Sequence, residues 1–187
     1  MRIIAGKFRS RQLKSLKGLA LRPTSDMLRE ILFNILGPRV EGSRFLDLFA
    51  GTGAVGIEAI SRGAMSAVFV ENHPAAVRLI RENLASLEIK SGARIIASAV
   101  TPALAKLEKE HAAGFDFIFL DPPYANEKDY QATFHSLENS PLVAESTIVI
   151  AEHHKSFEPP ASVGQFDRVR ILRQGDSALS FYRRVLM

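Results

Sequence analysis

The stretch Asp121-Pro122-Pro123-Tyr124 combines groups that can act together on a planar amine. It follows an apolar run from Phe115 to Leu120, which is typical of a strand buried on both faces. The two prolines end this strand, because neither has an N–H to donate to a neighbouring strand. A carboxylate, backbone carbonyls and an aromatic ring are thus expected at the carboxyl end of a strand, where open α/β sheets bind ligands. The alternative interpretation is a turn that only terminates the strand.

A second motif, Asp47-Leu48-Phe49-Ala50-Gly51-Thr52-Gly53, lies upstream. It follows the predicted start of a strand at 44–46 and precedes a predicted helix at 54–60. A strand, a glycine turn and a helix in this order form the layout of a nucleotide-cofactor loop. The next predicted strand, 67–70, ends in Glu71, and a carboxylate at this position is suited to accept hydrogen bonds from both ribose hydroxyls.

Gly51, Gly53 and Gly56 also match the dinucleotide fingerprint GxGxxG, so an NAD enzyme is a rival interpretation. Two features argue against it. A carboxylate at Asp47 would lie near the charged end of the cofactor, where it suits an ammonium or sulfonium better than a pyrophosphate. Hydride transfer also has no evident use for Asp121-Pro122-Pro123-Tyr124.

Composition limits the other possibilities. The chain of 187 residues has the size of one domain. It has no cysteine, which excludes disulfides, thiolate zinc sites and cysteine nucleophiles. No apolar run approaches a membrane span and the N-terminus lacks the pattern of a signal peptide, so we expect a cytoplasmic protein. His153 and His154 have no convergent carboxylate motif, so we expect a surface pair and no metal site.

The positive charge is concentrated at the N-terminus. The net charge is +4, yet residues 1–22 hold seven basic and no acidic residues, while the other 165 residues hold 17 basic and 20 acidic ones. A basic arm on a nearly neutral body is typical of binding to a phosphate backbone. Apolar residues alternate with the charges, which favours a short hairpin with Gly6 near its turn over a solvated tail. The basic residues are Arg2, Lys7, Arg9, Arg11, Lys14, Lys17 and Arg22.

Alternating strand and helix patterns along the rest of the chain predict a mostly parallel α/β sheet. Thr24 or Ser25 is suited to cap a first helix that ends at Gly37-Pro38. Gly175-Asp176 is a hairpin turn signal, which adds antiparallel pairing at one edge. Further strands are predicted at 94–97, 147–151, 168–172 and 179–183, and further helices at 101–110, 128–137 and from Pro74.

Taken together, these motifs resemble a class I S-adenosylmethionine-dependent methyltransferase that acts on an exocyclic amine. The N-terminal part, over 1–6, 22–26, 29–30 and 32–36, resembles the RsmD family, and the resemblance covers nearly the whole chain. It implies a Rossmann-like seven-stranded sheet with a C-terminal hairpin. It also implies methyl transfer to the 2-amino group of one guanine in 16S ribosomal RNA. We expect residues 1–22 to form a basic RNA-binding extension and 23–187 to form the methyltransferase domain.

The resemblance also implies roles for individual residues. The loop with Asp47, Phe49, Gly51 and Gly53 would contact the methionine part of S-adenosylmethionine, Glu71 the ribose, and Ser98-Ala99 the adenine, while Thr24 would lie near the cofactor. Asp121 and the Pro122 carbonyl would accept from the amine, Pro123 would complete the rigid turn, and Tyr124 would stack on the base. The arm residues Arg2, Lys7, Arg9, Arg11, Lys14 and Arg22 would bind RNA. The chain departs from the family pattern at Met27, where Arg is usual, and at Ser98, where Asp or Asn is usual.

Three classes of function remain open from the residues themselves. The first is an RNA guanine amino-methyltransferase, which we expect to be a monomer that acts on free RNA or within the 30S particle. The second is an amino-methyltransferase for DNA adenine or a protein side-chain amide, which would use the same pocket. The third is an NAD enzyme or a non-catalytic RNA-binding protein on a related fold. The basic arm favours the first class over the second.

Overall fold

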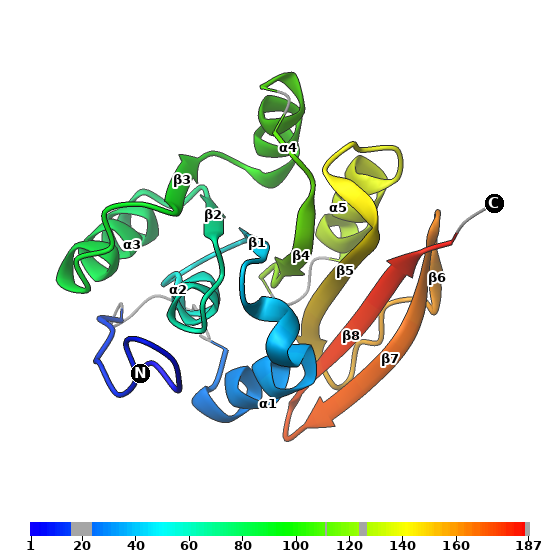
Figure 1. Ribbon diagram of the computed structural model, residues 1–187. Coiled ribbons are helices and arrows are strands. Elements are labelled where there is room, and N and C mark those ends of the chain that lie inside the picture. The colour runs from blue at the N-terminus through cyan, green and yellow to red at the C-terminus, as the bar shows by residue number, and fades with distance from the viewer. Residues whose placement is uncertain (16–23, 111, 124–126, 186–187) are drawn as a thin grey trace.

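The computed structural model describes residues 1–15, 24–110, 112–123 and 127–185, and these residues are built around one eight-stranded sheet. The strand order is β3-β2-β1-β4-β5-β8-β7-β6 (Figure 1). The first five strands of this order, from β3 across to β5, pair in parallel. The last three, β8, β7 and β6, pair antiparallel. The strands are β1 (Arg44–Leu48), β2 (Ser66–Glu71), β3 (Ala93–Ala97), β4 (Phe115–Leu120), β5 (Val143–His154), β6 (Ser162–Val163), β7 (Phe166–Gln174) and β8 (Ser177–Arg184).

The predicted α/β class and the C-terminal hairpin are confirmed. The structure adds an eighth strand, β6, whose two residues are too few to carry a sequence pattern. Strand β5 extends beyond the predicted 147–151 at both ends, because its first residue, Val143, pairs with Phe115 of β4 and its last residues pair with β8. The turn at Gly175-Asp176 joins β7 to β8 as expected.

Strand β1 lies at the point where the strand order reverses. It pairs with β2 on one side and with β4 on the other, so the chain proceeds outward from β1 in both directions. The connections that leave the carboxyl ends of β1 and β4 therefore diverge to opposite faces of the sheet. In open α/β sheets this arrangement creates a crevice for a ligand.

Helices cover both faces of the sheet (Figure 1). The apolar side chains of α1, α2 and α3 pack against one face, together with Phe45, Phe69 and Phe117 of the strands. Those of α4 and α5 pack against the other face, which gives the molecule two apolar layers. The helices are α1 (Asp26–Leu36), α2 (Ala54–Ser61), α3 (Pro74–Ser86), α4 (Val100–Lys109) and α5 (Glu127–Leu137). In the part of the chain that the structure describes, no helix is long and apolar enough to cross a membrane.

The ends of α1 follow from local chemistry. The Ser25 hydroxyl accepts the Leu28 N–H at 3.1 Å, so Ser25 and not Thr24 is the capping residue. The helix ends at Gly37, whose N–H donates to the Phe33 carbonyl. A short 3-10 turn, Gly37–Val40, then leads toward β1.

The N-terminal arm, residues 1–15, doubles back on itself and joins the core. Arg2 and Gln12 form an antiparallel bridge, which agrees with the predicted hairpin, although no regular strand forms. Ile3 and Leu13 are both buried in the same apolar layer as α1 and α2. Gly6, at φ 81°, lies so close to α2 that a Cβ atom would be 1.8 Å from the Ser61 carbonyl oxygen. A side chain here would push the arm away from the helix.

A buried ion-pair network holds the arm against α1 and α2. Glu58 of α2 accepts the backbone N–H groups of Ile4 and Ala5 at 2.8 and 3.0 Å. It also pairs with Arg62 at 2.7 Å and with Arg29 of α1 at 3.7 Å. The side chains of Glu58 and Arg29 are both fully buried, and their charges are compensated by each other together with Arg62 and Asp26.

We expect Glu58→Ala to lower the free energy of unfolding by about 3–5 kcal/mol, because it removes the buried counter-charge of Arg29 and leaves this buried guanidinium with only the partly exposed Asp26. Urea denaturation followed by circular dichroism measures the change. The matched control is Glu82→Ala, which removes an exposed pair with Lys14 and should cost less than about 1 kcal/mol. Equal effects of the two substitutions would show that the buried network does not hold the arm.

Candidate active site

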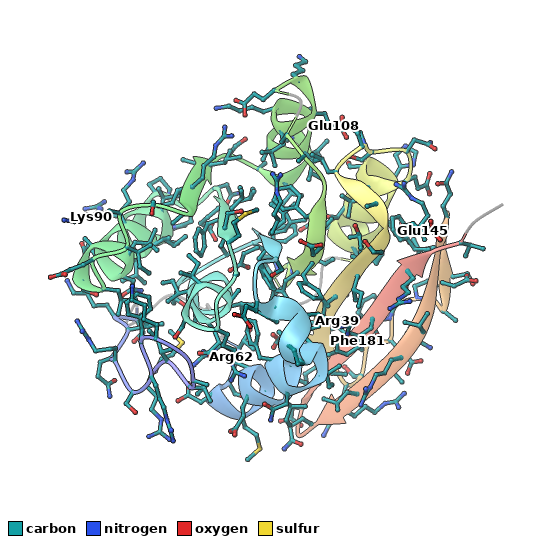
Figure 2. All side chains as sticks on the ribbon, in the orientation of Figure 1. Arg39, Arg62, Lys90, Glu108, Glu145 and Phe181 are labelled. Carbon is teal, nitrogen blue, oxygen red and sulfur yellow. The ribbon has the colours of Figure 1, made fainter. Side chains whose placement is uncertain are left out.

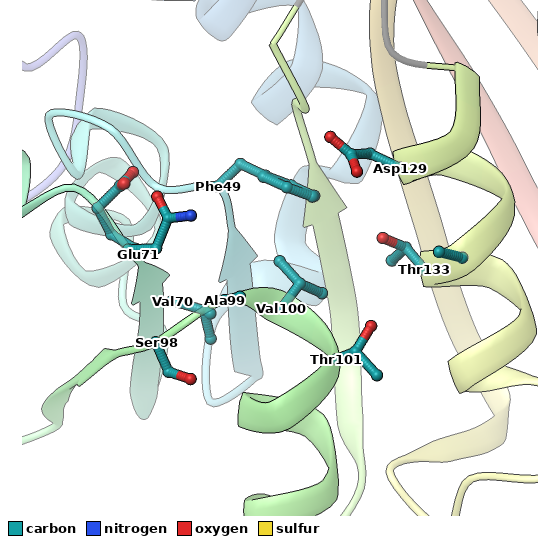
Figure 3. A pocket seen from close by; sticks show the side chains of 11 residues that line it. Phe49, Val70, Glu71, Ser98, Ala99, Val100, Thr101, Asp129 and Thr133 are labelled. Atoms are coloured by element: carbon teal, nitrogen blue, oxygen red, sulfur yellow. The ribbon is translucent and has the colours of Figure 1, made fainter.

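A cavity of about 170 Å³ opens at the carboxyl ends of the parallel strands. Phe49 follows β1, Glu71 ends β2, and Ser98 and Ala99 follow β3, so three neighbouring strands contribute to one wall. Helix α5 supplies Asp129 and Thr133 from the other side, and the Phe49 ring extends between the two walls (Figure 3). The cavity therefore lies at the crevice that the strand order predicts.

The glycine loop connects β1 to α2 along this crevice. Gly51 and Gly53 have φ angles of 55° and 77°, and Phe49, which is not a glycine, has a φ of 60°. A Cβ atom on Gly53 would approach Ile80 of α3 to 3.2 Å, so both the backbone angle and the packing favour glycine there. The loop thus brings its backbone close to the cavity and starts α2 without a capping side chain.

Asp47 is buried at the base of the loop, with only 2% of its surface exposed. Its Oδ2 atom accepts the Gly56 N–H at 2.8 Å, one of the free donors in the first turn of α2. Burial raises the pKa of the Asp47 carboxyl from its usual 3.8 to about 8; the Gly56 hydrogen bond opposes this rise and the nearby Glu71 charge adds to it. An acidic group thus occupies the helix terminus that a dinucleotide pyrophosphate would need.

Gly56, the third glycine of the GxGxxG match, has a packing function. A Cβ atom there would lie 2.4 Å from the Phe69 ring and 3.1 Å from Asp47 Oδ2. The glycine therefore allows α2 to pack closely on β2. The match to the dinucleotide fingerprint has a structural explanation that requires no NAD.

Glu71 connects the end of β2 to the glycine loop. Its Oε2 atom accepts the Gly51 N–H and its Oε1 atom accepts the His73 N–H, both at 2.8 Å. These two bonds fix the orientation of a buried carboxylate at the rim of the cavity. A preset carboxylate loses little conformational entropy when it accepts further hydrogen bonds from a ligand.

Asp121 directly follows β4, between the end of β1 and the C-terminal part of β5. The last paired residues are Leu48 with Leu120 and Leu120 with Ala151, so the next residues along, Phe49 and Glu152, flank Asp121. Pro122 is buried and Pro123 is exposed. Tyr124 lies outside the residues that the structure describes.

Glu152 is a candidate site residue that the sequence analysis missed. It is buried on β5, and its Oε2 atom accepts the Thr24 hydroxyl at 2.6 Å. The Tyr130 hydroxyl of α5 donates to the Glu152 carbonyl, so two segments distant in sequence meet here. The signal was present, since an acid directly after the apolar run 147–151 resembles Glu71 after 67–70.

Comparison with known proteins assigns the family. Residues 1–183 match the family model described as "Conserved hypothetical protein 95". The chain is 33% identical over 184 residues to the Escherichia coli protein "Ribosomal RNA small subunit methyltransferase D", covering 98% of this chain and 90% of that one. The chain belongs to the RsmD family.

Other RsmD-family comparisons agree over most of the chain. The Haemophilus influenzae protein of the same name is 35% identical over 150 residues, covering 80% of this chain and 77% of that one. A solved structure of a hypothetical protein from Thermus thermophilus superposes with a TM-score of 0.80 at 35% identity, covering 97% and 98% of the two chains. These matches confirm the predicted Rossmann-like fold and the family resemblance.

The structure brings only some of the predicted cofactor residues of this RsmD-family chain to the cavity wall. Phe49, Glu71, Ser98 and Ala99 line it. Asp47, Gly51 and Gly53 lie in the adjoining loop, and the Thr24 hydroxyl is engaged with Glu152. The lining residues that the sequence analysis did not name are Val70, Asn72, Val100, Thr101, Asp129, Ala132 and Thr133.

The prediction that His153 lies at the surface is wrong. The imidazole is buried, with Nε2 at 2.9 Å from the Ser180 hydroxyl, because β5 continues to His154 and pairs with β8. Burial lowers the pKa of His153 below its usual value. Among the described residues, no group of three or more histidine or acidic side chains is arranged to hold a metal ion.

The arm exposes five of the predicted RNA-binding side chains. Two are engaged with α3: Arg11 donates to the Ser86 carbonyl at 2.9 Å, and Lys14 pairs with Glu82 at 2.9 Å. Arg22 lies outside the described residues. The exposed five are Arg2, Lys7, Arg9, Arg11 and Lys14.

We expect Asp47→Asn to flatten the pH dependence of stability. Between about pH 4 and pH 8 the unfolded chain releases the Asp47 proton and the folded protein retains it, so stability falls as pH rises through this range. An amide still accepts the Gly56 N–H and does not ionise, so the variant should gain on the order of a few kcal/mol at pH 8 relative to wild type. Urea denaturation of both proteins at pH 4 and pH 8 measures the free energy of unfolding. An equal difference between variant and wild type at the two pH values would contradict the prediction.

Proposed function

We propose that this protein transfers a methyl group from S-adenosylmethionine to the 2-amino group of a guanine in 16S ribosomal RNA, leaving S-adenosylhomocysteine. One observation carries the proposal: in a chain of the RsmD family, Asp121 follows β4 between the end of β1 and the C-terminal part of β5, beside a strand-end cavity lined by the Glu71 carboxylate. Transfer to a ribosomal RNA is what the names of its relatives describe. Those names do not specify the methylated atom, and the guanine 2-amino group is our assignment.

The residues that line the cavity fit the proposed cofactor. Glu71 is an oriented acceptor for the ribose hydroxyls, and Ser98 and Ala99 border the place proposed for the adenine. A cavity of about 170 Å³ is smaller than the roughly 300–1,000 Å³ usual for ligand pockets, so we assign it to the adenosine part alone. The methionine part would extend along the glycine loop toward Asp47. When bound, the cofactor supplies a methyl group on a positively charged sulfur.

Asp121 and the Pro122 carbonyl would act on the acceptor amine. The nitrogen lone pair of an aryl amine is delocalised into the ring, which makes the nitrogen a weak nucleophile. Two acceptors for its hydrogens would favour a pyramidal nitrogen with a localised lone pair. Prolines 122 and 123 restrict the backbone, so that these acceptors are held in position before the base arrives. We assign Tyr124 to stacking on the base, which is worth about 1–3 kcal/mol.

The N-terminal arm would bind the RNA backbone. Its basic side chains are exposed while its backbone is held by Glu58 and Ser61, so the charges are presented on a fixed support. We extend the proposal to a cytoplasmic monomer that acts on free RNA or on the 30S particle. The target base must leave its stack to reach Asp121.

Methyl transfer from labelled S-adenosylmethionine tests the proposal. The acceptors are ribosomal subunits, free ribosomal RNA and duplex DNA from cells that lack this protein, followed by nucleoside analysis. Label on the 2-amino group of a guanine in small-subunit RNA supports the proposal. Label only in DNA or protein would overturn it.

We expect Asp121→Ala to abolish turnover and to leave the affinity for S-adenosylhomocysteine within about twofold of wild type, because the proposed acceptor contacts the amine and not the cofactor. Calorimetric titration and the labelling assay measure the two quantities. The matched control is Asp116→Ala on the same strand, whose carboxylate accepts the Arg44 N–H at an exposed position and should leave turnover unchanged. Full activity of Asp121→Ala would remove the assigned role.

We expect Lys7→Ala and Arg9→Ala each to weaken RNA binding and to reduce the slope of log affinity against log salt by about 1, because each removes one phosphate contact. Single substitutions are preferable to deletion of the arm, which would also remove the buried Ile3 and Leu13. Lys106→Ala on α4, away from the arm, is the control. An unchanged slope in both arm variants would show that the arm does not contact phosphates.

A further inference from the structure

A groove of about 410 Å³ lies between the arm and the first turns of α1. One wall comes from the turn of the arm and the other from one face of the helix, where Asp26, Met27 and Glu30 lie side by side at helical spacing. This groove is separate from the cavity at the strand ends, with which it shares no lining residue. Its lining residues are Arg2, Ile3, Ile4, Arg9, Ser10, Asp26, Met27 and Glu30.

Both walls of the groove are held by the same buried side chain. The Nη2 atom of Arg29 donates to the Arg2 carbonyl on the arm and to Asp26 Oδ1 on α1, the latter at 3.0 Å. On the same segment of the arm, the Glu58 carboxylate accepts hydrogen bonds from the Ile4 and Ala5 N–H groups. Since Arg29 is fully buried, the spacing between the walls is set by the core. The groove is therefore organised before any ligand binds.

The groove presents three kinds of group to a ligand. Arg2 and Arg9 are exposed guanidinium groups suited to a phosphate, and Arg2 also lies 3.8 Å from Asp26 in a partly exposed ion pair. Glu30, one helical turn from Asp26, is an exposed carboxylate that can accept hydrogens from an exocyclic amine or ring N–H. Met27 is 57% exposed and offers a polarisable apolar surface for the face of a base. A bare phosphate would be repelled by Glu30, whereas a nucleotide has a phosphate for the arginines, a base face for Met27 and an amine or ring N–H for Glu30.

Ser10 gives the arm wall an unusual backbone. Its φ is 67°, in the left-handed region that non-glycine residues seldom occupy, and its N–H donates to the Ile3 carbonyl across the turn. Such strained angles are found often at ligand-binding segments. Here the angle closes the turn that carries Arg9 into the groove.

The groove also lies near the proposed catalytic edge. Asp26 is two residues from Thr24, so their Cα atoms are at most about 7 Å apart. The Thr24 hydroxyl donates to Glu152, which lies in β5 next to the position of Asp121 after β4. One end of the groove is therefore within reach of an RNA strand whose target base occupies the Asp121 site.

We propose that this groove binds one single-stranded nucleotide that flanks the target guanine, with its phosphate on Arg2 and Arg9 and its base against Met27 and Glu30. The inference rests on the proposed function and specifies its RNA recognition. In this arrangement Met27 contacts the base and not the phosphate. The base at this position should therefore contribute to affinity.

Binding to a set of short single-stranded RNAs tests the proposal. Each RNA carries the target guanine and one abasic flanking position. With the wild-type protein, we expect loss of one particular flanking base to weaken binding about tenfold. Met27→Ala and Glu30→Gln should each weaken binding to the intact RNA, and the penalty for that same abasic position should largely disappear.

Matched controls have the same residue types elsewhere on the surface. Met65→Ala removes a methionine that is 61% exposed, and Glu145→Gln removes a carboxylate at the start of β5, on the opposite side of the molecule from the arm (Figure 2). Both should retain the wild-type abasic penalty. Identical penalties in Met27→Ala, Glu30→Gln and wild type, or no flanking base that matters, would overturn the inference.

The labelling assay separates this inference from the proposed function. If the wild-type protein methylates the guanine and the groove variants bind like wild type, only the groove assignment fails. If the wild-type protein does not methylate ribosomal RNA, the proposed function fails and the groove assignment fails with it.

Discussion

The burial of Glu58 is the constraint on which the arrangement of the N-terminal half depends. A carboxylate without solvent needs donors, and it receives them from Arg62 and from the arm backbone at Ile4 and Ala5, while Arg29 lies 3.7 Å away as an ion-pair partner. These partners come from α1, from the end of α2 and from the arm, so compensating one buried charge holds the three segments in one geometry. The contacts of buried Glu58 therefore fix the positions of the exposed basic side chains of the arm and of the first turn of α1.

A second set of bonds connects the glycine loop to its surroundings. Asp47 accepts from Gly56 at the start of α2, and Glu71 accepts from Gly51 at the end of β2. Asn83 of α3 is buried and donates to the Thr52 carbonyl of the loop, and the same side chain bonds the Lys14 backbone through both of its polar atoms. The loop proposed to bind the cofactor and the arm proposed to bind RNA are therefore both hydrogen-bonded to the side-chain amide of Asn83.

The sites proposed for chemistry and for RNA recognition lie on different parts of the scaffold. The cavity and Asp121 belong to the ends of parallel strands, while the groove belongs to the arm and α1. They approach each other at Thr24 and Glu152, where a buried hydroxyl–carboxylate bond joins the start of α1 to β5. In this arrangement, the strand ends define which atom reacts, and the arm and α1 define which RNA segment is held nearby.

The sequence by itself determined the features that depend on local pattern. Apolar runs ending in Glu71 and Asp121 marked strand ends, the glycines marked the loop before α2, and the excess of basic residues at 1–22 marked the arm. Only the tertiary structure decided which segments meet. The pairing of Thr24 with Glu152, the burial of His153 against β8 and the Arg29–Glu58 network join residues between 27 and 128 positions apart. Such contacts follow from sheet order and helix packing, which no local pattern records.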